Sequence, residues 1–304
     1  MSGTFVLSLD TEIAWGTYAN LSQRTQTFDN YRRLLLRLRR QLDIFEISAT
    51  WAVVGGLLHP DGPRSPLLDV QYSFATTTER ERINSHPTAW FYQPGLIDIV
   101  LAARAPQEIA SHTMTHLLAT DPAVTRTMFE AQLAAVVQAH AEAGLPAPRS
   151  LVYPQNRIAH TDLLPQYGFR SYRGVEQSAY THLPPWASRP AHLLNRALAV
   201  PPPTYAPVQQ PGTPLNLPAS QFLMAYDGIR AKIPTAARVH QARRGLNRAI
   251  QRGEIYHLWF HPFNLGSSDE MLDAFTQILA LVYQDREQGT LRVQTMQQVA
   301  ADLR

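Results

Sequence analysis

Hydrophobic and polar positions follow two alternating patterns along the chain. Short apolar runs, typical of buried strands, occur at 5–9, 47–54, 108–111, 150–153 and 255–260. Between them, apolar residues recur every three or four positions, as they do in amphipathic helices. Strands that alternate with helices favour a parallel sheet with helices packed on it, and therefore an α/β fold.

The helical pattern is clearest at 28–45, where Leu34, Leu35, Leu38 and Leu42 recur at helical spacing with arginines between them. Two proline-rich stretches are predicted to be long irregular loops that cover the surface. These loops are expected at 60–95 and 183–220. Further helices are predicted at 121–144 with Asp121 as its cap, at 236–253 and at 269–287, and a short strand at 290–295 precedes a terminal helix.

Composition narrows the class of protein. The chain has 304 residues, of which 45% are hydrophobic, and no internal repeat, so we expect a single domain over 1–304. A formal net charge of +3 is too small to indicate a nucleic-acid partner. No apolar run reaches the roughly 18 residues of a membrane span. The N-terminus has no pattern of a secretory signal, which favours a soluble, cytoplasmic protein.

Cysteine is absent from the chain, so disulfides and thiolate metal sites are excluded and any metal must bind His, Asp or Glu. Polar residues of these types follow several predicted strands directly. The carboxyl ends of parallel strands meet at one edge of a sheet or barrel, where active sites form. The residues expected to meet there are Asp10 and Glu12, His112 and His116, the run 154–157, and His261.

His112 and His116 are four positions apart. On one helical turn they would face the same way and could hold one ion, although such a pair also occurs in ordinary helix packing. Two imidazoles and one carboxylate would leave positions open for water and substrate. Of Asp10 and Glu12, one could bind the ion while the other stays free as a base.

Five segments together resemble the motifs of the polysaccharide deacetylase family (the NodB-homology domain), in the order of that family. The D-x-E spacing of the first motif is similar to that of the family's intracellular branch. The resemblance implies a distorted (β/α) barrel and metal-dependent removal of an acyl group from an amino sugar. The segments are SLDTE (8–12), SATWAVVG (48–55), EIASHTMTH (108–116), LVYPQN (151–156) and GEIYHLWFHP (253–262).

The resemblance also implies roles for single residues. Asp10 corresponds to the catalytic base and His261 to the general acid, while Glu12, His112 and His116 correspond to ligands of one divalent metal, zinc by preference. The arginine that steadies the base in the family is missing before Pro154. Arg157 or Asn156 could replace it.

The sequence indicates the substrate less clearly than it indicates the reaction. Trp15 and Trp90 could line the cleft or belong to the core, and a backbone N–H near Tyr153 could hold an oxyanion. Asn156 and Arg157 are further candidates for substrate binding. The arginines of 236–253 could face solvent or meet a phosphate-bearing substrate.

Three functions remain open. The first is an N-deacylase, for acetyl or formyl groups, that acts on a small or nucleotide-linked amino sugar. The second is a hydrolase of the same fold that acts on a non-sugar C–N bond. The third is a catalytically inactive carbohydrate-binding protein, which the full set of base, acid and ligands disfavours because a binding protein needs no base or acid.

Overall fold

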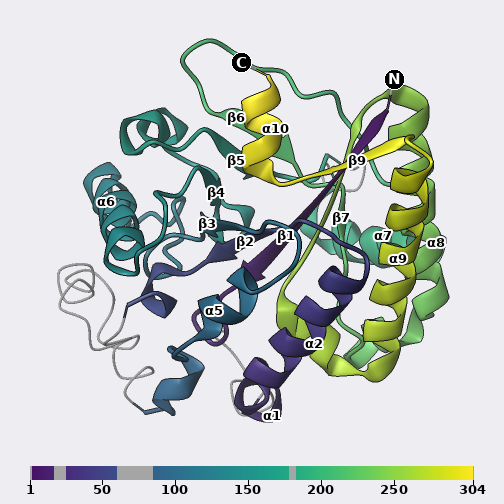
Figure 1. The fold of residues 1–304 in the computed structure, drawn as a ribbon, viewed down its shortest axis with the longest axis horizontal. Coiled ribbons are helices and arrows are strands. Elements are labelled where there is room, and N and C mark those ends of the chain that lie inside the picture. Colours follow the sequence, from purple (N-terminus) through teal and green to yellow (C-terminus); the bar gives the residue numbers. More distant parts are fainter. Residues whose placement is uncertain (1, 17–24, 60–84, 178–182, 304) are drawn as a thin grey trace.

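The computed structural model describes residues 2–16, 25–59, 85–177 and 183–303. In these residues nine strands form one sheet in the order β6-β5-β4-β3-β2-β1-β8-β7, with β9 paired to the first half of β1 (Figure 1). The pairs between these strands are all parallel. The strands are β1 Gly3–Thr11, β2 Thr50–Val53, β3 Glu108–Ser111, β4 Ser150–Val152, β5 Ser171–Gly174, β6 Leu215–Pro218, β7 Gln221–Phe222, β8 Ile255–Phe260 and β9 Leu291–Gln294.

The sheet curls into a barrel because its two ends are joined by the chain itself. Strands β6 and β7 lie at opposite ends of the strand order but are separated in the chain only by Ala219 and Ser220. The Ala219 N–H donates to the Gly174 carbonyl at the end of β5, and the Ser220 N–H donates to the His257 carbonyl in β8. This crossing confirms the predicted distorted (β/α) barrel.

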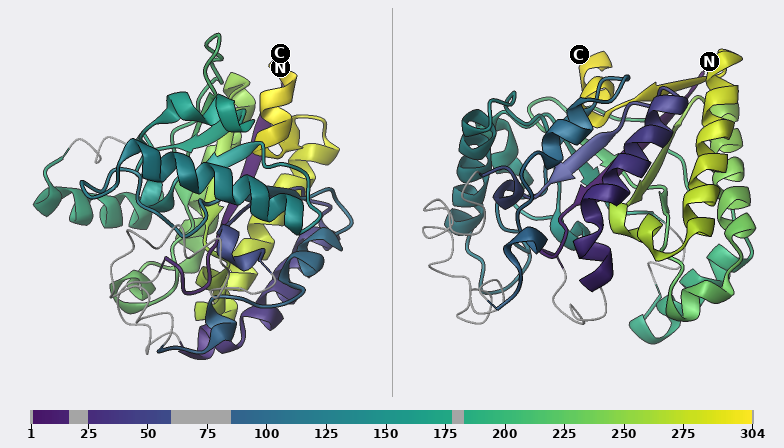
Figure 2. Two further views of the ribbon diagram at one scale, coloured as in Figure 1. Left: turned by 90° about the vertical axis from the view of Figure 1, so that its left-hand side faces the viewer. Right: turned by 60° about the horizontal axis from the view of Figure 1, so that its bottom comes forward.

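Helices surround the curled sheet (Figures 1 and 2). Side chains alternate along a strand, so Phe5, Leu7 and Leu9 of β1 point outwards into the main core, where helix residues such as Leu35 and Phe275 pack against them. The helices are α1 Thr25–Asp29, α2 Tyr31–Ile44, α5 Leu96–Leu101, α6 Arg126–Glu142, α7 Pro185–Ala197, α8 Thr235–Arg252, α9 Asp269–Glu287 and α10 Met296–Asp302.

Apolar side chains from several strands meet inside the barrel, beside buried polar side chains at the start of β2 and β3. Val6, Ala52, Val152 and Ile255 come from four strands and form one cluster with Met296 of α10. Helix α10 thus covers that end of the barrel, beside the N-terminus in Figure 1. The polar residues singled out by the sequence lie at the opposite end, where the strands stop.

The helices predicted at 28–45, 236–253 and 269–287 are confirmed. The helix predicted at 121–144 begins later, at Arg126, because Thr125 caps it by accepting from the Met128 N–H, while Asp121 accepts from the Ala123 N–H in the preceding turn.

The prediction of an irregular loop over 183–220 is wrong, because α7 and β6 lie within it. Proline suits the start of a helix, and Pro184 and Pro185 are at the start of α7. Of the loop predicted at 60–95, residues 60–84 lie outside the described part of the chain. No helix in the described residues has both the length and the apolar composition needed to cross a membrane.

Candidate active site

The two carboxylates at the end of β1 point into the barrel. Ser8 and Asp10 follow Val6 on its inward face, and Glu12 continues this alternation just beyond the strand. Asp10 and Glu12 are each only 3% exposed. Burial of a carboxylate costs free energy unless its charge is neutralised. The groups around each acid therefore indicate its role.

Glu12 lies among three imidazoles. Its Oε2 is 2.9 Å from His116 Nε2 and 3.3 Å from His112 Nε2, and its Oε1 is 3.4 Å from His261 Nε2. Burial acts to raise the pKa of Glu12, but His261, His116 and His112 together hold that pKa well below its usual range. A Cβ atom at residue 16 would lie 2.4 Å from the Glu12 carboxylate, so Gly16 leaves the space that this side chain occupies. Glu12 is therefore a buried carboxylate whose three imidazole neighbours favour its ionised form.

A loop, and not a helical turn, brings His112 and His116 together, so the helical placement predicted for them is wrong. Thr113 and His116 have φ values of 60° and 61°, in the left-handed region. Gln132 of α6 accepts from the N–H groups of Met114 and Thr115 and so ties the loop to the helix. The two imidazole centroids lie 5.0 Å apart.

The tautomer of His112 follows from its surroundings. His112 Nδ1 is 2.7 Å from the Val152 carbonyl, which can only accept, so Nδ1 carries the proton. The other nitrogen, Nε2, is then free to bind a metal.

The residues fit a metal ion with three protein ligands. The ligand atoms of Glu12, His112 and His116 all lie within 4.8 Å of one another. His112 Nε2 and Glu12 Oε2 are buried and make no hydrogen bond of acceptable geometry in the described structure. One carboxylate oxygen and two imidazole nitrogens match the donors of catalytic zinc sites, which keep further positions open.

Asp10 is bound by an arginine from the other side of the barrel. Arg173 of β5 donates from Nη1 to Asp10 Oδ1 at 2.6 Å and from Nη2 to Asp10 Oδ2 at 2.7 Å. Burial acts to raise the pKa of Asp10, but the charges of Arg173 and His112 reverse this effect and lower it. Asp10 is thus kept ionised and oriented, as a general base requires.

The arginine that binds Asp10 is Arg173, rather than the predicted Arg157 or Asn156. Arg157 is exposed, while the Asn156 side-chain oxygen accepts from Arg173 Nε at 3.2 Å and from Nη2 at 3.0 Å. Asn156 thus holds the arginine. The sequence carried a signal for this, because Ser171 and Arg173 are two positions apart at the end of a short strand, and both therefore face inwards.

His261 follows β8 and completes the cluster. Its ring stacks on Phe263 with centroids 4.8 Å apart, and its side chain is 21% exposed, more than those of Glu12, His112 and His116. Burial lowers the pKa of His261, although Glu12 and Asp10 act to raise it. The imidazole lies opposite Glu12 and is placed to exchange a proton with a substrate.

The aromatic candidates lie in the core. Trp15 and Trp90 are 1% and 4% exposed, and their indole N–H groups donate to the Phe91 carbonyl and to Asp29. Tyr153 is fully buried and donates to the Ala159 carbonyl. The structure therefore places these three side chains in the core, where their polar atoms form hydrogen bonds within the protein.

Two other aromatic residues lie at the site. Trp259 is half-buried beside Arg173, whose guanidinium carbon lies 4.1 Å from its ring centroid. Burial raises the pKa of Tyr31 well above its usual range, and the charges of Glu12 and Asp10 add to this effect. The Tyr31 hydroxyl and the Trp259 indole N–H are buried and make no hydrogen bond within the described residues.

Three of the five arginines of α8 bind other groups of the protein. Arg238 is buried and donates to backbone carbonyls, Arg243 pairs with Asp285 at 2.8 Å, and Arg244 donates to the Ala199 carbonyl. These three arginines are thus already engaged by the protein.

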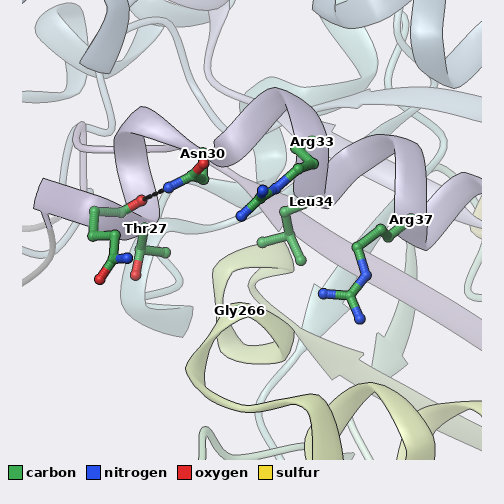
Figure 3. A pocket seen from close by; sticks show the side chains of 7 residues that line it. Thr27, Asn30, Arg33, Leu34, Arg37 and Gly266 are labelled. Atoms are coloured by element: carbon green, nitrogen blue, oxygen red, sulfur yellow. Dashed lines mark hydrogen bonds between the residues drawn. The ribbon is translucent and has the colours of Figure 1, made fainter.

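Other cations line a cavity of about 200 Å³ between α1, α2 and the turn that follows His261 (Figure 3). The side chains of Arg33 and Arg37 point into it, and Arg37 also pairs with Asp269 at 2.7 Å. The same helix α1 also contacts the site's surroundings, because Phe28 packs on Phe263, which stacks on His261.

The chain shares its fold with polysaccharide deacetylases. A Mycobacterium smegmatis structure of that description matches with a TM-score of 0.62 over 99% of this chain and 91% of its own, at 18% identity. A second, from Pseudomonas aeruginosa PAO1, matches with a TM-score of 0.58 over 98% and 89%, at 9% identity. The Puue allantoinase matches with a TM-score of 0.60 over 98% and 89%, also at 9% identity.

At these identities the likeness establishes the fold and not the activity. No protein-family model matches the sequence, and no curated protein matches it significantly.

Proposed function

We propose that the protein is a metal-dependent hydrolase of the polysaccharide deacetylase family that removes an N-acyl group from an amino sugar. One observation carries the proposal. The predicted ligands Glu12, His112 and His116 converge at the carboxyl end of the barrel strands, with Asp10 and His261 beside them.

The two acids at the end of β1 divide the chemistry between them. Glu12, with the two histidines, would hold a divalent ion, zinc by preference, which supplies Lewis-acid polarisation of the acyl carbonyl. Asp10 lies in the same cluster but is bound to Arg173 instead. It is the base that takes the proton of the attacking water at a carboxylate oxygen.

His261 acts on the leaving group. An amine leaves poorly unless it is protonated, and His261 Nε2 faces the same cluster as Asp10. This nitrogen gives the proton to the amide nitrogen as the C–N bond breaks. The side chain of Tyr153 takes no part in this proposal. Its backbone N–H would donate a hydrogen bond to the oxyanion.

The substrate is a small amino-sugar derivative in this proposal. Glu12, His112 and His116 are only 3%, 1% and 2% exposed, which suits a closed pocket better than the open groove that a polymer needs. The cavity with Arg33 and Arg37 could take the phosphate of a nucleotide-linked sugar, as arginines commonly do.

A hydrolase of a non-sugar C–N bond is the second candidate, and the observation in its favour is that an allantoinase shares the fold. An inactive carbohydrate-binding protein is disfavoured, because such a protein gains nothing from a buried, arginine-bound base opposite an imidazole.

The test compares catalytic efficiency on N-acetyl and N-formyl amino sugars, free and nucleotide-linked, with that on chitin oligomers and on non-sugar amides. We expect the small sugars to be the best substrates. Asp10→Asn and His261→Ala should each retain the metal and lose about 10²–10⁴-fold in kcat. A clear preference for polymers or non-sugar amides would contradict the substrate class, and near-wild-type rates in both variants would contradict the mechanism.

A further inference from the structure

Three polar side chains lie below Asp10, between the site and the end of the barrel that α10 covers. Ser8, Arg173 and His257 come from β1, β5 and β8, and each is at most 1% exposed. The mechanism uses only the contact of Arg173 with Asp10, so the reason for two further buried polar groups is open.

Every N–H of the Arg173 guanidinium makes a hydrogen bond. Besides its bonds to Asp10 and Asn156, Nη1 donates to Ser8 Oγ at 3.1 Å. The Trp259 ring covers the guanidinium at 4.1 Å. The orientation of Arg173 is therefore determined by four residues, of which Ser8 is the deepest.

The hydrogen bonds below Arg173 have a defined direction. An arginine can only donate, so Ser8 Oγ accepts from it and sends its own proton elsewhere. His257 Nε2 lies 2.8 Å from Ser8 Oγ and is the acceptor of that proton. Burial, followed by the charge of Arg173, lowers the pKa of His257 to about 3, which keeps the ring neutral. Its proton is then on Nδ1, which faces the Tyr205 hydroxyl at 3.5 Å.

We propose that Ser8 and His257 are positioning residues for the reaction, which act through Arg173 on the base Asp10. His257 accepts from Ser8, Ser8 thereby presents a lone pair to Arg173 Nη1, and Arg173 meets both oxygens of Asp10. Without this acceptor, the buried Nη1 would keep one N–H unsatisfied, and the guanidinium would turn away from Asp10 to satisfy it. The proposal rests on the proposed function, because it needs Asp10 as the base.

The test removes the chain of hydrogen bonds one member at a time. Ser8→Ala and His257→Leu should lower kcat about 10–100-fold, the loss typical of groups that orient catalytic ligands, with KM and metal content close to wild type. His257→Gln should recover part of the rate, because its amide oxygen can accept from Ser8.

Ser150→Ala is the matched control. Ser150 bonds to Ser171 at 2.8 Å within the same barrel, so this variant also loses one buried hydroxyl, but it does not disturb Arg173. It should lose a similar amount of thermal stability and keep its kcat. If Ser150→Ala loses as much rate as Ser8→Ala, or if Ser8→Ala keeps full rate, the positioning role is overturned.

Two further measurements separate this proposal from the proposed function. Ser8→Ala should have no added effect on kcat in an Asp10→Asn background, and an unreduced effect there would contradict action through the base. The side-chain ¹⁵N signals of Arg173 need no substrate, and they should shift in Ser8→Ala and stay in place in Ser150→Ala. Unshifted signals in Ser8→Ala overturn the positioning role whatever the substrate is, while a fully active Asp10→Asn would overturn the base itself.

Discussion

Glu108 and Glu12 are both buried inside the barrel, Glu108 where the strands begin and Glu12 where they end. Each has one carboxylate oxygen without a hydrogen bond in the described structure. Glu108 Oε2 accepts from the Thr50 hydroxyl at 2.8 Å and from the Gln297 N–H at 3.0 Å. Burial dominates there and raises the pKa of Glu108, whereas the imidazoles around Glu12 lower the pKa of Glu12.

The difference shows two ways to neutralise a buried acid. At the floor of the barrel the neighbours of Glu108 are hydroxyl and amide groups, so a proton is the only neutralising charge within reach. At the mouth, three imidazoles surround Glu12 and a cation can be held instead. A buried glutamate therefore becomes a candidate metal ligand through its neighbours and not through its burial.

The largest effect is expected when the Glu12 carboxylate is replaced by a neutral group. We expect Glu12→Gln to lose the metal and to lose activity at least as severely as removal of a general base, about 10²–10⁴-fold, because an amide is a weak metal ligand. Elemental analysis of the purified protein and kcat on the best substrate give the result. Glu108→Gln is the matched control and should keep both metal and rate. Full metal content in Glu12→Gln would remove Glu12 from the site.

A second change tests whether Glu108 serves the fold alone. Glu108→Leu fills similar space but removes the acceptor of the Gln297 N–H at the start of α10. We expect it to destabilise the protein by about 1–3 kcal/mol, the cost of an unsatisfied buried donor. Denaturant unfolding gives the stability, and kcat per metal-loaded protein should stay at the wild-type value. A loss of rate without a loss of stability would show that the floor of the barrel takes part in catalysis.

The smallest predicted effect is a change in how the stability of the fold depends on pH. A raised pKa means that Glu108 stabilises the fold below its unfolded-state pKa of about 4.5, and that this contribution is lost as pH rises through the folded-state pKa. Glu108→Gln cannot titrate, so its stability relative to wild type should increase as pH rises above about 4.5. Unfolding free energies of both proteins measured from pH 4 to 8 check this sign. A stability difference that falls with rising pH would mean that Glu108 is ionised in the fold.

The parallel α/β sheet and the shared rim could be predicted because they depend on local patterns, whereas the barrel and the roles of single residues came from the resemblance to a known family. Alternation along β1 places Asp10 on the inward face, and the carboxyl ends of parallel strands meet, so His112 and His261 could be assigned to the same rim. The error over 183–220 arose because its prolines suggested a loop, although Pro184 and Pro185 suit the first turn of α7.

The sequence by itself thus determined the alternation of strands with helices and the residues that could hold a metal, because periodicity and strand ends are properties of neighbouring residues. Only the tertiary structure decided which cation binds the base, since Arg173 and Asp10 are 163 positions apart and meet across the barrel. It also decided that His257 is neutral and that Glu12 and Glu108 shift in opposite directions. The physical reason is that a pKa depends on burial and on every charge nearby, and these surroundings exist only once distant strands have packed together.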